Sequence, residues 1–152
     1  MVRRNRGFTL IELLCVLSLI VIAAAIALPA FSNPLQTAKL KSDARQLTWV
    51  IRSCRQDAIT TGAAKTIKFY TNDSENQKYK VVGGDTCSLS QGVFFVGTTT
   101  FSTTLGGCKT CICYSSGACS GGTVTLSNGD RRLYVIVNPI SGRVRISDEP
   151  PW

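Results

Sequence analysis

Arg6-Gly7-Phe8-Thr9-Leu10-Ile11-Glu12-Leu13 joins a basic N-terminal tip to a long apolar run. Three arginines lie before position 7, and residues 13–28 contain a single polar side chain, Ser18. As a helix, residues 8–31 would extend about 36 Å, which exceeds the ~30 Å hydrocarbon core of a bilayer. The pattern predicts one membrane-spanning helix with a positively charged flank.

The position of Gly7 indicates that this helix is retained in the mature protein. A secretory signal has its small-residue cleavage site after the apolar region, whereas Gly7 precedes that region. Glu12 lies near the start of the apolar run. A carboxylate at full membrane depth costs roughly 2.5 kcal/mol or more, so we expect Glu12 to have a function and a partner.

The order Gly-Phe-Thr-Leu-Ile-Glu resembles the class III signal of type IV pilins and of the pseudopilins of type II secretion. The resemblance implies that a prepilin peptidase cleaves between Gly7 and Phe8 and that Phe8 is then N-methylated. It also implies that Glu12 pairs with the N-terminal amine of a neighbouring filament subunit, which would compensate the desolvated carboxylate. An ordinary single-span anchor with an interfacial glutamate explains the apolar run, but not this order of residues.

Pro29 is a second feature that this chain shares with pilins. Proline inside a helix removes a backbone hydrogen bond and crowds the preceding turn. In pilins, a proline at this position marks where the helix bends or loosens on packing into the filament. The alternative is a helix end at the membrane surface, with Ser32-Asn33 capping a new helix that begins at Pro34.

Beyond Pro34, apolar side chains recur at alternating intervals of four and three residues, which predicts one apolar stripe along a helix. Gly62 is the expected end of this helix. We expect a sheet to cover the stripe, which consists of Leu40, Ala44, Leu47, Ile51, Cys54 and Ala58.

From Lys65 onward, short β-rich runs alternate with Gly, Ser, Asn and Asp. Asn128-Gly129 predicts a two-residue hairpin turn between two of these strands. Residues 83–109, with their Thr and Gly runs, are expected to form a variable loop region. The predicted strands are 66–70, 78–82, 93–96, 111–114, 123–126 and 131–137, with 143–146 as an edge strand.

The predicted fold class is therefore α+β, with a long N-terminal helix, half membrane-spanning and half amphipathic, packed on an antiparallel sheet. We divide the chain into a cleaved leader (1–7), a membrane and filament-core helix (8–31) and an amphipathic helix plus external β-rich domain (32–152). The order of motifs in the C-terminal half resembles the GspH/FimT group of minor pilins and pseudopilins, which implies a pilin-like fold. These motifs are residues 111–117, 121–126, 134–137 and 142–145.

Six of the seven cysteines lie in the external domain, where an oxidising environment favours disulfides. Cys15, in the membrane helix, is expected to stay reduced. The disulfide candidates are Cys54, Cys87, Cys108, Cys111, Cys113 and Cys119, and the fifteen possible pairings remain open. An all-cysteine metal site at Cys108, Cys111, Cys113 and Cys119 is the alternative. We expect disulfides, with no metal or cofactor.

The sequence gives no indication of an enzyme. The chain has no histidine and no glycine-rich phosphate loop. The external acids show no ligand-like clustering; they are Asp43, Asp57, Asp73, Glu75, Asp85, Asp130, Asp148 and Glu149. We therefore expect the function to reside in assembly and surface contact.

The charge balance favours a polyanionic partner. Removal of the leader leaves 14 basic residues against nine acids. In FimT-type minor pilins of natural transformation, a Gly-Arg-x-Arg motif contacts DNA, and residues 142–145 match this motif. The resemblance implies DNA binding by Arg143 and Arg145, and we add Arg131 and Arg132 on the neighbouring hairpin arm. The alternative is that Arg143 and Arg145 are charge-paired residues of an edge strand, beside Asp148 and Glu149.

The predicted function is that of a non-enzymatic filament subunit. The subunit would be a single-pass inner-membrane protein with a periplasmic domain, assembled with other pilin or pseudopilin subunits after cleavage by prepilin peptidase. The first hypothesis is a minor pilin of a type IV pilus that also binds DNA for transformation. The alternative is a GspH-like minor pseudopilin of type II secretion, and a third option is an abundant structural pilin.

Overall fold

The computed structural model describes residues 8–71, 77–97 and 99–151, with the backbone alone at 26–33. The chain divides into two compact units, Met1–Leu35 (the N-terminal unit) and Gln36–Trp152 (the C-terminal unit). Helix α1, Leu10–Thr61, contributes to both units. It continues through positions 29 and 34, so the alternative in which a separate helix begins at Pro34 is wrong. Each proline removes one backbone hydrogen bond, but the helix continues on both sides of it.

In the N-terminal unit, α1 begins with a side-chain cap. The backbone amide of Glu12 lies 3.3 Å from the Thr9 hydroxyl oxygen and 3.1 Å from the Thr9 carbonyl oxygen. Thr9 therefore satisfies an amide that the helix itself leaves unpaired. Among the described residues we find no helix that is long and apolar enough to cross a membrane, so the span predicted over residues 8–31 is not confirmed.

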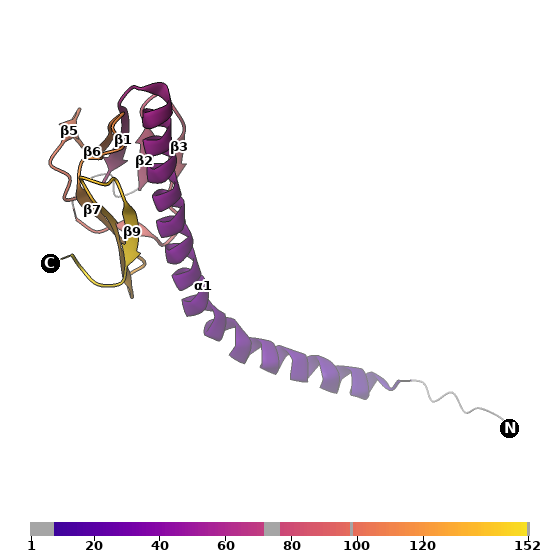
Figure 1. The fold of residues 1–152 in the computed structure, drawn as a ribbon. Coiled ribbons are helices and arrows are strands. Elements are labelled where there is room, and N and C mark those ends of the chain that lie inside the picture. Colours follow the sequence, from indigo (N-terminus) through magenta and orange to yellow (C-terminus); the bar gives the residue numbers. More distant parts are fainter. Residues whose placement is uncertain (1–7, 72–76, 98, 152) are drawn as a thin grey trace. The chain divides into compact units, whose positions relative to one another are not determined.

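In the C-terminal unit, the predicted stripe of α1 is the buried face of the helix. All six stripe residues are at most 3% exposed. The helix ends at Thr61, and Gly62 follows with a φ of 68°, the left-handed conformation that glycine adopts without strain. Figure 1 shows this half of α1 beside the strands. Both the stripe and the helix end are thus confirmed.

The strands form two antiparallel sheets rather than the single sheet that we predicted. The first sheet has the order β3-β2-β1-β6-β5. Its strands are β1 (Lys65–Tyr70), β2 (Lys78–Val81), β3 (Thr86–Ser88), β5 (Thr104–Leu105) and β6 (Cys108–Cys113). Ile67 and Phe69 of β1, both buried, join the apolar side chains of α1 in one hydrophobic core.

The second sheet has the order β4-β7-β8-β9. Its strands are β4 (Phe94–Phe95), β7 (Gly122–Ser127), β8 (Arg132–Val137) and β9 (Val144–Ser147). Along β8, Leu133, Val135 and Val137 are buried and contribute to the core. The predicted strand at 143–146 is confirmed as the edge strand β9, shifted by one residue.

The hairpin between β7 and β8 lies where Asn128-Gly129 predicted it, but its loop has four residues. The last paired residues are Ser127 and Arg132, so residues 128–131 form the loop. Gly129 has a φ of 96°, whereas no described non-glycine residue has a positive φ. The Asn128 side-chain oxygen instead accepts hydrogen bonds from the amides of Asp130 and Arg131. This Asx-type turn replaces the predicted two-residue turn.

Residues 83–109, predicted as a variable loop region with one strand at 93–96, contain three short strands and the core residues Val93, Phe95 and Phe101. β3, β4 and β5 have only two or three residues each. Phe101 is completely buried, and its ring stacks on Phe69 with 5.4 Å between the ring centroids. β4 lies within the strand predicted at 93–96, whereas β3 and β5 were not predicted, because strands this short show too little alternation to be recognised.

Candidate functional site

The N-terminal unit exposes an apolar helix surface. All residues at 8–25 are exposed, although most of them are large apolar side chains. Such residues are Phe8, Leu10, Ile11, Leu13, Leu14, Val16, Leu17, Leu19, Ile20, Val21 and Ile22. A helix that is apolar on all sides requires burial against other helices or lipid. These side chains are therefore candidates for burial against other helices or lipid.

Glu12 lies on this surface, in the first turn of α1. A carboxylate there interacts favourably with the partial positive charge of the helix N-terminus. Thr9 and Glu12 also have the Thr-x-x-Glu spacing of a capping box, a signal that the sequence analysis missed. The leader, including Gly7, lies outside the described residues, so cleavage before Phe8 stays a prediction, as does the assembly role of Pro29.

Arg143 and Arg145 lie where the sequence predicted them. Both are exposed and flank the buried Val144 at the start of β9. Together with residues of β8 and of the β8–β9 turn, they line a cavity of about 520 Å³. The lining residues are Ile136, Val137, Asn138, Pro139, Ser141, Arg143 and Arg145.

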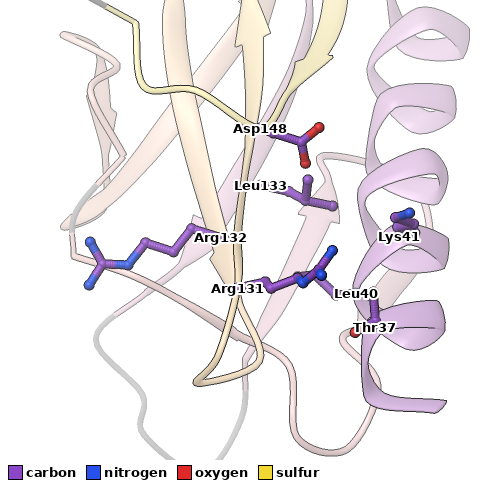
Figure 2. Close-up of a pocket in the computed structure, with 7 residues that line it drawn as sticks. All are labelled: Thr37, Leu40, Lys41, Arg131, Arg132, Leu133 and Asp148. Carbon is purple, nitrogen blue, oxygen red and sulfur yellow. The ribbon is translucent and has the colours of Figure 1, made fainter. Parts of the chain in front are cut away.

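Arg131 and Arg132 line a different cavity, of about 380 Å³, between α1 and the β7–β8 hairpin. Figure 2 shows Arg131 extending toward Leu40 and Thr37 of α1, while the guanidinium of Arg132 extends to the opposite side. The remaining lining residues are Lys41, Leu133 and Asp148.

The four arginines therefore do not form one patch. Arg145 pairs with Ile136, which is four residues from Arg132 along β8, a separation of roughly 13 Å. Arg132 and Arg145 share the outer face of the second sheet, because their positions alternate with the buried residues of β8 and β9. Arg131, by contrast, extends toward the helix (Figure 2).

The alternative of a charge-paired edge strand is supported only in part. β9 is an edge strand. However, within residues 99–151 neither guanidinium of Arg143 and Arg145 has a hydrogen-bond or ion-pair partner. Asp148, one of the proposed partners, lines the other cavity with Arg131.

Four cysteines of the C-terminal unit gather in its core. Cys54 of α1, Cys111 and Cys113 of β6, and Cys119 after it are at most 3% exposed. The sulfurs of Cys113 and Cys119 are 3.0 Å apart in a thiol–thiol hydrogen bond. Only long-range packing brings Cys54 to this cluster, so the spacing of the cysteines along the chain did not predict its membership.

Cys87 and Cys108 lie apart from this cluster. They occupy β3 and β6, which are separated by two intervening strands, a distance of roughly 14 Å that rules out a bond between them. Cys108 also has the opposite strand parity from Cys113 and so faces away from it. In the described part of the chain, no three or more His, Cys, Asp or Glu side chains lie together in a group that could hold a metal ion.

Hydrogen bonding shifts the thiol pKa values within the cluster. The Cys113 side chain lowers the pKa of Cys119, and the positive charge of Arg55 acts in the same direction. Cys113 likewise lowers the pKa of Cys54. The pKa of Cys113 itself is raised, first by its hydrogen bonds to Cys111, Cys119 and Cys54 and then by burial. Cys119 and Cys54 are therefore the better candidates for thiolates.

Comparisons with known proteins give consistent results. Residues 2–28 match a family described as "Prokaryotic N-terminal methylation motif". The chain is 29% identical to the type II secretion system protein H of Xanthomonas campestris pv. campestris over 147 residues, which cover 94% of this chain and 83% of that protein.

The fold also matches a solved structure, the minor pseudopilin EpsH from the type 2 secretion system of Vibrio cholerae. The TM-score is 0.54 at 13% sequence identity, with 72% of this chain and 96% of that chain covered. This match confirms the predicted α+β fold, with an N-terminal helix packed on antiparallel strands. The N-terminal motif, the likeness along most of the chain and the shared fold together support a GspH/FimT-like type IV pilin.

Proposed function

We propose that this subunit is a minor pseudopilin of a type II secretion system. The observation that carries the proposal is the likeness to the secretion protein H of Xanthomonas, which extends over 94% of this chain and so includes both the helix and the β-rich unit. The GspH-like pseudopilin, which was the alternative hypothesis from the sequence, is therefore the first candidate. The subunit acts by assembly and not by catalysis.

The N-terminal unit supplies the assembly surface in this proposal. Residues 8–31 hold the subunit in the inner membrane as a single span, with the C-terminal unit in the periplasm. Prepilin peptidase removes residues 1–7, and the new amine of Phe8 is methylated. The exposed apolar side chains of the helix then pack against other pseudopilins, with Pro29 at the point where the helix loosens on packing.

Glu12 guides this packing. It lies on the exposed helix surface, four residues after the new N-terminus, in a first turn that the Thr9 cap keeps ordered. Because a carboxylate buried among apolar helices needs an opposite charge nearby, Glu12 pairs with the N-terminal amine of a neighbouring subunit.

Processing and localisation can be tested together. Co-expression of the full chain with a prepilin peptidase is expected to give an inner-membrane protein whose first residue is N-methylated Phe8, as read by mass spectrometry of the intact chain. A Gly7→Glu variant should keep residues 1–7. A soluble wild-type chain, or one that keeps residues 1–7, would contradict the proposal.

A second candidate function is DNA binding by a minor pilin, which the guanidinium groups of Arg143 and Arg145 favour, because both are exposed and have no partner among the described residues. Arginine forks suit phosphate oxygens. The test uses residues 36–152, the compact C-terminal unit, and a duplex titrated across a salt series. Arg143→Gln with Arg145→Gln should flatten the salt slope by about two units if each arginine contacts one phosphate.

The other two arginines provide the matched control for that experiment. Arg131→Gln with Arg132→Gln removes the same charge but lies on the other cavity. An equal loss of affinity in both double variants would indicate attraction by net charge alone. No binding by the wild-type unit at low salt would eliminate this candidate.

A further inference from the structure

We propose that Cys113 and Cys119 form a disulfide in the mature protein, with Cys54 as a free thiol packed against it. The proposal rests on the proposed function in one respect, since a periplasmic domain is exposed to disulfide-forming conditions. It selects one bond from the fifteen pairings that the sequence leaves open.

The backbone holds these two cysteines directly opposite each other. Cys113 and Cys119 form an antiparallel bridge. The amide of Tyr114 donates to the carbonyl of Ala118 at 2.9 Å, and the amide of Ser120 donates to that of Ile112 at 2.7 Å. These bonds flank the bridge, so the two cysteines are a non-hydrogen-bonded pair, with Cα atoms about 4.5 Å apart. That separation lies within the range that disulfides require.

The side chains are also oriented for a bond. Their sulfurs are 3.0 Å apart, about 1 Å more than an S–S bond. The Cys111 sulfur lies 3.8 Å from the carbonyl oxygen of Ser120, to which its thiol donates a weak hydrogen bond. Cys54 contacts Cys113 from helix α1, but no strand ladder holds these two backbones opposite each other. Cys119 is therefore the preferred partner of Cys113.

Bond formation needs an external disulfide as oxidant, either a protein disulfide or a small one such as oxidised glutathione. The Cys119 thiolate attacks one sulfur of this oxidant, forms a mixed disulfide and releases one thiolate. Cys113 then loses its proton to solvent and attacks the Cys119 sulfur, which releases the second thiolate. Two electrons pass from the cysteines to the oxidant, and two protons pass to solvent.

The bond would fix the loop formed by residues 114–118, which lies between helix α1 and the β8–β9 turn. Within this loop, the Gly117 carbonyl accepts a hydrogen bond from Nε of Arg55 on α1 at 2.7 Å. The amide of Cys119 donates to the carbonyl of Pro139, in the turn that leads to Arg143. The disulfide thus stabilises a loop whose hydrogen bonds link helix α1 to the β8–β9 turn.

Peptide mapping tests the pairing directly. The full chain, purified in detergent, is treated with oxidised glutathione, alkylated in denaturant without reductant and digested with trypsin. Residues 110–131 then form one peptide with three cysteines, and Cys54 lies in the short peptide 53–55. We expect peptide 110–131 to carry one alkyl group and one internal disulfide. Cleavage after Tyr114 should leave its two parts joined, and fragmentation should place the alkyl group on Cys111 and the bond between Cys113 and Cys119; an alkyl group on Cys113 would overturn the pairing.

Two cysteine variants test which residues pair, and alkylation of cell fractions tests where the chain is located. Cys54→Ser should keep the internal disulfide, whereas Cys119→Ser should lose it. A link between peptides 53–55 and 110–131, or three alkyl groups on peptide 110–131, would overturn the pairing. Alkylation of intact cells and spheroplasts tests the location separately: a chain found only in the cytosol would count against the proposed function, while the pairing seen with oxidised glutathione would stand.

Discussion

Both carboxylate oxygens of Asp43 accept hydrogen bonds from Ser90, one from the backbone amide and one from the hydroxyl, each at 2.8 Å. Asp43 is only 4% exposed, so this interaction fastens helix α1 to the segment before β4 with a buried charge. Hydrogen bonds to a charged group contribute more than those between neutral groups.

We therefore predict that Asp43→Ala destabilises the C-terminal unit by about 2–4 kcal/mol, because it removes the charge-assisted bonds and leaves the Ser90 amide unpaired. The measurement is urea unfolding of residues 36–152. Asp57→Ala, an exposed acid on the same helix, is the control and should change the stability by less than about 0.5 kcal/mol. Equal effects of the two substitutions would refute the buried interaction.

Gly142 should not tolerate a side chain. Its φ is 63°, and an added Cβ would clash with the carbonyl oxygen of Gly117 and with Nε of Arg55. Gly129 also has a positive φ, but nothing lies within 4 Å of its added Cβ. We predict that Gly142→Ala lowers the melting temperature of the unit more than Gly129→Ala does, since only the former combines backbone strain with a steric clash.

The stability of the C-terminal unit should decrease at high pH in a way that depends on Tyr79. Burial raises the pKa of Tyr79, and Cys87 beside it acts in the same direction. The stabilisation is complete below the unfolded pKa of about 10 and is lost as the pH rises through the folded value. Above pH ~10, this residue should contribute a decrease of up to about 1.4 kcal/mol per pH unit. Unfolding free energies measured between pH 8 and 11 should decline less in Tyr79→Phe, and identical declines would contradict the prediction.

Removal of the Glu12 charge should prevent assembly of the subunit but should not prevent its cleavage by prepilin peptidase. Glu12→Gln keeps the shape of the side chain but cannot pair with the amine of a neighbouring subunit. Because the loss of one partner of a buried ion pair costs about 3–5 kcal/mol, co-purification with other pseudopilins should fall by more than tenfold. Cleavage before Phe8 should be unchanged. The matched control is Ser18→Ala, which removes another polar group of the same helix and should assemble normally.

The sequence was informative where one local pattern determines the structure. The stripe from Leu40 to Ala58 follows helical periodicity, and each of its residues is buried. Position 129 required a glycine, yet the loop was longer than predicted because the Asn128 side chain replaces backbone hydrogen bonds. Strands of two or three residues, such as β3 and β5, show no recognisable alternation.

The parts of the site that depend on distant contacts could not be predicted. Asp43 was counted among the external acids, because its partner Ser90 lies 47 residues away. Arg132 and Arg145 share one face but are separated along β8, and Arg131 extends toward α1, so the division of the four arginines between two cavities depends on the sheet register. The assembly of Cys54 with Cys113 and Cys119 likewise requires the packing of α1 on the first sheet.

The most direct test of the proposed function is the distribution of type II secreted proteins in a strain that lacks this gene. We predict that these proteins accumulate in the periplasm, and that the wild-type chain restores their release to the medium while the Glu12→Gln variant does not. Normal secretion in the deletion strain, together with a loss of DNA uptake that only a chain with intact Arg143 and Arg145 restores, would contradict the account and favour the DNA-binding pilin.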